Sequence, residues 1–309
     1  MQITYPVPAE TTSVFVVAVD RTPTELSSIV PWRMGRPHRR AAMEALGTPR
    51  LELEAFRAGQ SPWKRLESQA FRAGQSPWKR IELEGDDDLR RIKRARHHVV
   101  VSSTAPVAAQ PEAAQIARAA ARGVAEAYHG VIVDQLTGSA VYHCVECPGE
   151  REEFRLSDDW LSWTTEFSED SSCPPWDPAG TEICACLRVT TRGLRRFGLP
   201  EVMLDGAACA HSLCTVNVLR TVAQRLLTGH LDWLAGNPGA RCRTIGEHLR
   251  VDGADFAVFS GSPDLDGEPF RVRLTRDAAD RSCLRVGPPA GFDGSLNDWL
   301  CRTPGLLAA

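Results

Sequence analysis

Short valine-rich segments alternate with amphipathic helices along the first half of this chain, and this alternation restricts the fold more than any other feature. The segment 13–19 is typical of a buried strand, and Thr22-Pro23 predicts the start of a helix that extends to about residue 30. Further along we expect strands over 80–84 and 98–102, a helix over 111–128 and a strand over 131–136. The order strand, helix, strand, strand, helix, strand predicts an α+β unit of the ferredoxin-like, split βαβ type.

A tandem duplication interrupts this pattern. Residues 51–65 and 66–80 are two copies of one segment, and their last eleven residues, 55–65 and 70–80, are identical. Two short copies cannot build a solenoid, which needs three or more repeats to bury a continuous core. We therefore expect the duplicated segment 51–80 to be an insertion in which one copy loops out. The alternative is a two-site docking motif.

The middle of the chain is acidic and contains closely spaced prolines, among them Pro174, Pro175 and Pro178. This composition predicts a linker over 148–180, with a short helix at Trp160 and Trp163. The linker would separate a first domain, 1–147, from a second domain, 181–309.

One long helix dominates the predicted second domain. It begins at His211 or Ser212, carries apolar residues at helical spacing and ends before Asn237-Pro238-Gly239. Strands are expected over 181–190, 201–204, 247–251, 255–259, 270–274 and 283–286, with turns at 193–199, Asp252-Gly253 and Asp266-Gly267. The sequence thus predicts two α/β-sandwich units.

The charge of the chain is nearly balanced. Its 309 residues include 36 Lys and Arg against 39 Asp and Glu, and the net charge of −3 gives no general attraction to nucleic acid or to an anionic membrane. The chain has no apolar run of the roughly 20 residues that a membrane span requires, and no signal peptide is evident. We expect a soluble, cytoplasmic protein in which most of the ten Cys stay reduced.

Several familiar motifs are missing from the sequence. It has no P-loop, no G-x-G-x-x-G after the first strand, no H-E-x-x-H and no G-x-S-x-G. The acidic segment 264–268 resembles part of a calcium loop but lacks the glutamate of the twelfth position, so a hairpin turn is the better interpretation. We expect no cofactor.

Cysteine spacing gives a candidate zinc site. Structural zinc usually takes four ligands from two short knuckles. The candidate ligands are His143, Cys144, Cys147, Cys173, Cys184 and Cys186. On a strand, Cys184 and Cys186 would share a face, about 7 Å apart. Because that second pair is C-x-C rather than C-x-x-C, thiols that pack without a metal are the preferred interpretation.

A second candidate is a reactive thiol at the start of the long helix. Cys214 lies in the expected first turn, where exposed N–H groups can lower the pKa of a thiol. His211 could act as its base, and Asp205 is the nearest carboxylate in the sequence. The preferred alternative is that His211 or Ser212 caps the helix and Cys214 packs in the core.

A basic run over 90–98 raises the question of nucleic-acid binding. It precedes the strand 98–102, which would be central in a ferredoxin-like sheet. RNA-recognition domains carry stacking aromatics on that strand, whereas Val99, Val100 and Val101 stand here. We prefer a solvated turn and expect no nucleic-acid partner.

The segment 190–201, TTRGLRRFGLPE, resembles an element of uncharacterised bacterial proteins that carry a domain of unknown function, and 130–138, GVIVDQLTG, is similar to them as well. The resemblance implies a family but no activity. Taken together, these features favour a non-enzymatic binding or protein-interaction module, in which paired edge strands would give a homodimer. The alternatives are a thiol-dependent hydrolase using Cys214 and His211, and a structural zinc-binding protein.

Overall fold

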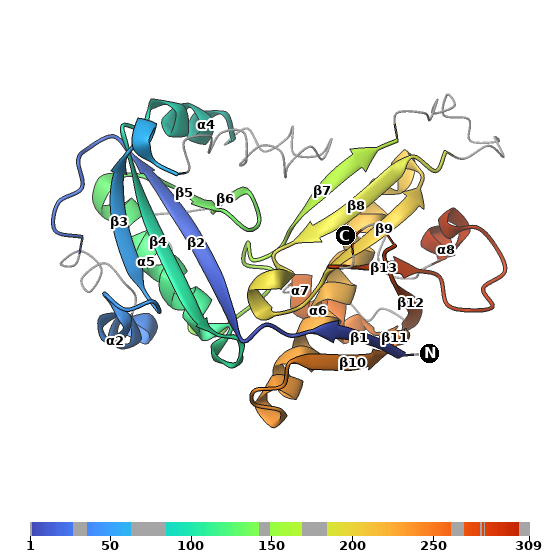
Figure 1. Ribbon diagram of the computed structural model, residues 1–309. Helices are drawn as coiled ribbons and strands as arrows, with labels where there is room; N and C mark the ends of the chain where they lie inside the picture. The colour runs from blue at the N-terminus through green and yellow to red at the C-terminus, as the bar shows by residue number, and fades with distance from the viewer. Residues whose placement is uncertain are drawn as a thin grey trace. The chain divides into compact units, whose positions relative to one another are not determined.

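A computed structural model of the chain (Figure 1) describes residues 2–26, 36–62, 85–141, 149–168, 184–260, 269–278, 280 and 282–302. The chain forms two compact units. Unit 1 combines Met1–Val7, Arg155–Arg195 and Leu199–Ala309, and unit 2 combines Pro8–Phe154 with Arg196–Gly198. Both units mix helices with sheets, which confirms the predicted α+β class.

Within the described residues, unit 2 contains a five-stranded sheet in the order β3-β4-β2-β5-β6. Each neighbouring pair of strands is antiparallel. The strands are β2 (Glu10–Val19), β3 (Glu52–Arg57), β4 (His97–Pro106), β5 (Val131–Asp134) and β6 (Ser139–Val141). The helices are α2 (Arg36–Ala45), α4 (Gly85–Arg94) and α5 (Glu112–Tyr128), with 3-10 turns η1 (Ala58–Gln60) and η3 (Val107–Ala109).

The two central strands of unit 2 bury side chains on both faces of the sheet. On one face, Val16 and Ala18 of β2 form a cluster with Ile92 of α4 and with two residues of β5. On the other face, Phe15 and Val17 are completely buried, and α5 packs against β2 and β4. This explains why β2 reads as a continuous apolar run rather than an alternating one.

Three predictions for unit 2 either differ from the structure or fall on residues that the structure does not describe. The described edge strand β3 lies in the first copy of the duplication, whereas the expected strand 80–84 lies outside the described residues. Residues 22–25 are not helical, and 27–30 are outside the described residues. The basic run does not form a solvated turn. Most of it belongs to helix α4, whose last turn carries Arg91, Lys93 and Arg94, where cations suit the helix dipole.

Unit 1 is built on a six-stranded sheet of the described residues, in the order β11-β12-β13-β9-β8-β7, and a separate pair, β1-β10. Only β13 and β9 pair in parallel among these described strands. Helix α6 packs on β8 and β9. The strands are β1 (Gln2–Pro6), β7 (Ser162–Phe167), β8 (Leu187–Arg192), β9 (Glu201–Ala207), β10 (Cys242–Gly246), β11 (His248–Val251), β12 (Phe270–Arg276) and β13 (Cys283–Gly287). The helices are α6 (Ser212–Gly236), α7 (Gly253–Ser260) and α8 (Leu296–Arg302), with the 3-10 turn η5 (Cys209–His211). A further 3-10 turn, η4 (Leu194–Phe197), begins in unit 1 and ends in unit 2.

The strand expected over 255–259 is wrong, because this segment belongs to helix α7. Its N-terminus is fixed by a reciprocal pair of hydrogen bonds: the Asp255 N–H donates to the Asp252 carboxylate at 3.2 Å, and the Asp252 N–H donates to Asp255 at 3.1 Å. This is a capping box, in which two side chains satisfy each other's backbone donors. The Asp252-Gly253 dipeptide therefore starts a helix and is not a hairpin turn.

The described part of the predicted linker also has regular structure. Residues 162–167 form strand β7, so the short helix expected at Trp160 and Trp163 is wrong. Trp160 is completely buried, and its carbonyl lies against Gly193, where an added Cβ would come within 2.2 Å of the Trp160 oxygen. The acidic composition of this segment therefore did not predict that part of it is buried and forms a strand.

Candidate functional site

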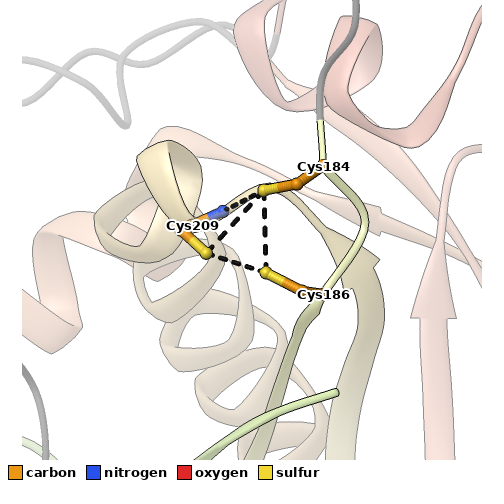
Figure 2. A group of neighbouring side chains, drawn as sticks. All are labelled: Cys184, Cys186 and Cys209. Atoms are coloured by element: carbon orange, nitrogen blue, oxygen red, sulfur yellow. Dashed lines mark hydrogen bonds between the residues drawn. The ribbon is translucent and has the colours of Figure 1, made fainter. Parts of the chain in front are cut away.

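Three cysteine side chains converge in unit 1 (Figure 2). Cys184 and Cys186 lie directly before β8, and Cys209 lies in the turn η5 that precedes α6. The Cys184 thiol donates to the Cys209 sulfur at 3.7 Å, and the Cys186 thiol donates to the Cys184 sulfur at 3.6 Å. The Cys186 and Cys209 sulfurs are 2.8 Å apart. We call these three residues the thiol triad.

Strand pairing explains why residues so far apart in sequence meet here. Strands β8 and β9 are antiparallel, and Leu187 at the start of β8 pairs with Ala207 at the end of β9. The chain just before β8 must therefore lie beside the chain just after β9. The turn η5 then places Cys209 at the beginning of α6, on the side of the two preceding cysteines (Figure 2).

The triad is largely enclosed. Cys186 is buried, while Cys184 and Cys209 are half-buried, and none of the three is in a disulfide. The backbone N–H of Cys209 donates to the Cys184 sulfur at 3.4 Å. A sulfur that already accepts from an amide is better able to carry the negative charge of a thiolate. The triad therefore combines three soft ligand atoms with a backbone donor to one of them, the Cys184 sulfur.

The geometry of the triad resembles part of a tetrahedral thiolate site. Zinc–sulfur bonds of about 2.3 Å at tetrahedral angles place two ligand sulfurs about 3.8 Å apart. The two distances from Cys184 are within about 0.2 Å of that value, since they are 3.6 and 3.7 Å. The Cys186–Cys209 pair would have to open by about 1 Å, which rotation of a side chain supplies.

Only two of the six predicted zinc ligands lie within the described residues. Cys184 and Cys186 belong to the triad, whereas His143, Cys144, Cys147 and Cys173 lie outside the described residues. The strand expected over 181–190 is wrong at Cys184 and Cys186, because residues 184–186 precede β8 and have no regular structure. The chain there brings the two sulfurs to 3.6 Å.

Cys209 is the member that the sequence analysis missed. The signal was present, since the turn predicted at 193–199 joins two predicted strands into a hairpin. Counting outward from the middle of that turn pairs position 184 with position 208, next to Cys209 and just after β9. The short prediction for β9, 201–204, hid this because the strand continues to Ala207.

The three residues of the thiol-hydrolase hypothesis do not assemble in the expected way. Cys214 lies in the first turn of α6, but burial raises the pKa of its thiol, with the nearby Cys301 as a second cause. A nucleophilic thiol needs the opposite shift. The expected effect of the helix N-terminus is outweighed because the thiol is buried, with 7% of the residue exposed.

The proposed partners of Cys214 have other contacts. His211 Nε2 lies 3.6 Å from the sulfur of Cys301, and burial lowers the pKa of His211. Asp205 on β9 forms an ion pair with Arg285 at 2.7 Å. His211 occupies the N-cap position of α6 without a capping hydrogen bond from its side chain.

Most of the element 190–201 lies in unit 1 and has a structural role there. The carboxylate of Glu201 is buried and accepts hydrogen bonds from the Thr191 hydroxyl at 2.8 Å and from the Gly193 N–H at 2.9 Å. The N–H groups of Leu194 and Arg195 donate to the same carboxylate. Burial raises the pKa of Glu201 in spite of these donors. The residues that carry the family resemblance therefore include a buried carboxylate that holds a turn.

Comparison with protein-family models, with curated proteins and with solved structures finds no match. The resemblance to uncharacterised bacterial proteins stays a prediction. Within the described residues, no helix is long and apolar enough to cross a membrane.

Proposed function

We propose that the protein binds a soft metal ion, zinc in the first instance, through the sulfurs of Cys184, Cys186 and Cys209. The observation that carries the proposal is the convergence of these three sulfurs within 4.8 Å of one another. Thiolates are the ligands preferred by zinc and by other soft ions. Packing in the core would explain two cysteines on one segment. It would not require a third sulfur from a different element to meet them.

The position of the triad favours a structural role for the metal. An ion held there would tie the chain before β8 to the turn before α6, two segments that backbone pairing alone leaves unconnected beyond Leu187. Metal binding at such a place adds its free energy to folding, because the ligands are far apart in the unfolded chain. The described residues supply three sulfurs, and water or another donor would complete four-coordination.

The wider proposal is a metal-stabilised, non-enzymatic binding or interaction module. The strand order β3-β4-β2-β5, with each pair antiparallel, supports a ferredoxin-like arrangement for unit 2, as does the place of α5 between β4 and β5. Pairing of edge strands such as β3 would give a homodimer. The thiol-hydrolase alternative is less well supported, because the pKa of Cys214 is raised.

The test is zinc binding by the reduced, full-length chain. Metal-free protein should take up one zinc ion per chain, with an affinity that rises with pH because thiols must lose their protons to bind. Cobalt in place of zinc should give a thiolate-to-metal charge-transfer absorption. Both signals should weaken at least tenfold in Cys184→Ser and Cys209→Ser.

The matched control is Cys242→Ser, which changes an exposed cysteine on β10 outside the triad. It should bind zinc as the wild-type chain does. Circular dichroism of each metal-free variant checks that the chain is folded. If the reduced chain takes up less than a tenth of an equivalent of zinc, or if Cys242→Ser weakens binding as much as Cys184→Ser, the proposal is wrong.

A further inference from the structure

The three sulfur–sulfur distances in the thiol triad are unequal, and the shortest one identifies the pair best placed to form a disulfide. The Cys186 and Cys209 sulfurs are 2.8 Å apart, whereas Cys184 lies 3.6 and 3.7 Å from them. A disulfide bond is about 2.05 Å long, so the close pair needs a movement of less than about 1 Å to form one. The same pair needs a similar movement in the opposite direction to bind zinc.

We propose that Cys186 and Cys209 form a reversible disulfide on exposure to a peroxide, and that this oxidation releases the metal from the triad. The inference rests on the proposed metal site and adds its regulation by an oxidant. The two states exclude each other, since a sulfur in a disulfide has lost the negative charge with which it binds the ion. Cys184 alone cannot hold a structural metal.

The chemistry requires one peroxide molecule for each disulfide. The thiolate of one cysteine attacks a peroxide oxygen, the O–O bond breaks, and a sulfenic acid and hydroxide form. The thiol of the second cysteine then attacks the sulfenic sulfur, the S–S bond forms, and water leaves. The two sulfurs are oxidised by two electrons in total, and hydrogen peroxide, the oxidant of the experiment below, is reduced to two molecules of water once the hydroxide takes up a proton.

Burial indicates which sulfur meets the oxidant. Cys209 is half-buried, whereas Cys186 is buried with 4% of the residue exposed. A small peroxide therefore reaches Cys209 more easily, and the enclosed Cys186 is in place to resolve the sulfenic acid before a second peroxide can oxidise it further. Cys184 is also half-buried, but its greater distance from both partners makes it the remaining thiol.

A reductant reverses the reaction. A thiol such as glutathione attacks the disulfide through a mixed disulfide and restores both cysteines. The half-buried Cys184 lies next to the pair and can itself attack the disulfide, so a minor cross-link from Cys184 is expected in the wild-type chain. The major product in the wild-type chain is the Cys186–Cys209 bond.

The experiment uses the full-length chain, reduced and loaded with zinc, with hydrogen peroxide as the oxidant. A colorimetric zinc chelator follows metal release, and mass spectrometry after digestion with trypsin locates the cross-link. Trypsin leaves Cys184 and Cys186 in the peptide 156–188 and Cys209 in the peptide 197–220, so fragmentation of the linked pair identifies the bond. We expect one zinc released per cross-link and recovery of zinc binding after reduction.

Variants separate the roles of the three cysteines. Cys186→Ser and Cys209→Ser cannot form the bond between positions 186 and 209, so any cross-link that peroxide forms in them measures the competing pairs with Cys184. Cys184→Ser should keep the bond between positions 186 and 209 in its metal-free form, although it binds zinc at least tenfold more weakly. Cys242→Ser, which changes an exposed cysteine outside the triad, should behave as wild type in both measurements.

The two proposals fail in different ways. If the reduced chain takes up no zinc, the metal site is wrong, and control of a metal by oxidation is overturned with it. If zinc binds but peroxide forms no Cys186–Cys209 bond, or forms the bond while zinc stays on the protein, only the present inference is overturned. A predominant cross-link from Cys184 in the wild-type chain also overturns it, because the sulfur distances select the other pair.

Discussion

The ion pair between Arg196 and Asp134 in unit 2 provides a demanding test of the packing described above. Both side chains are completely buried, and Arg196 Nη2 donates to Asp134 Oδ2. The Arg196 guanidinium also lies over the ring of Phe15, 5.6 Å from its centroid. Asp134 Oδ1 accepts from the Leu136 N–H at 2.9 Å. Because both charges are buried, a substitution that removes either partner should lower the free energy of unfolding strongly.

Removal of one partner should be strongly destabilising. Breaking a buried ion pair leaves an uncompensated charge and typically costs about 3–5 kcal/mol, a large part of the stability of a domain. We expect losses in this range for Arg196→Met and for Asp134→Asn, since the asparagine can keep the hydrogen bond from Leu136 but not the charge. The double variant removes both charges and should lose only about 1–3 kcal/mol. The coupling energy between the two positions should therefore be at least about 3 kcal/mol.

The control is an ion pair in the same unit that is exposed. Arg40 and Glu44 on α2 lie 3.0 Å apart, with 92% and 67% of their side chains exposed. Solvent screens such a pair, so Arg40→Met should change stability by about 0.5 kcal/mol or less. If the distance between the charged atoms alone determined the effect, Arg40→Met would also lower the free energy of unfolding substantially. The comparison of the two pairs therefore tests the effect of burial.

Native-state hydrogen exchange is the suitable assay, because a chain with two units need not unfold in one step. The protected amides of β2 and β4 report opening of unit 2 separately from unit 1. If Arg196→Met lowers the free energy of opening by less than about 1 kcal/mol, or if the double variant loses the sum of the two single losses, the argument from burial is refuted.

Two further predictions concern unit 1. Gly193→Ala should destabilise the chain by at least about 3 kcal/mol, because Gly193 has φ +134° and its added Cβ would lie 2.2 Å from the Trp160 oxygen. Gly287→Ala, at a position with open space and no positive φ, should change stability by less than about 0.5 kcal/mol, and urea unfolding compares the two variants. Burial and the adjacent Asp280 raise the pKa of Cys283 to about 11, so iodoacetamide near pH 8 should label Cys283 at least tenfold more slowly than the exposed Cys242. The raised pKa also means that the contribution of Cys283 to stability is present below the pKa of an unfolded thiol, about 8.5, and is lost as the pH rises towards 11. Equal labelling rates for the two cysteines near pH 8 would contradict this.

Segments with a regular apolar period were predictable because local burial alone determines them. Strand β2 and helix α5 lie close to their expected ranges, since one has a run of valines and the other an apolar residue at every fourth position. Helix α6 also begins at the expected Ser212. These elements bury one continuous surface, and their sequences show it directly.

Shorter elements were missed where the capping residues carried more information than the apolar pattern. The apolar residues of 255–259 suit a strand or a helix equally, and the Asp252–Asp255 capping box decides for the helix. Helix α8 has the same signal, because the Ser295 N–H donates to Asp298 at 2.8 Å and the Asp298 N–H donates to Ser295 at 3.2 Å. Reading such i, i+3 pairs first would have identified both helices.

The thiol triad depends on how two strands pair, which an apolar pattern and cysteine spacing do not show by themselves. Cys184 and Cys186 were recognised by their spacing, but Cys209 joins them only through the pairing of β8 with β9. The length of β9 depends on its burial between β8 and β13, which bond to its two edges. A predicted strand that ends at 204 places Cys209 in a remote loop, whereas one that ends at Ala207, which pairs with Leu187, places it beside the segment of Cys184 and Cys186. Three residues of strand therefore decide whether the sequence shows isolated thiols or a cluster of three. In a hairpin, the ends of the strands should be determined before its cysteines are assigned to a common cluster.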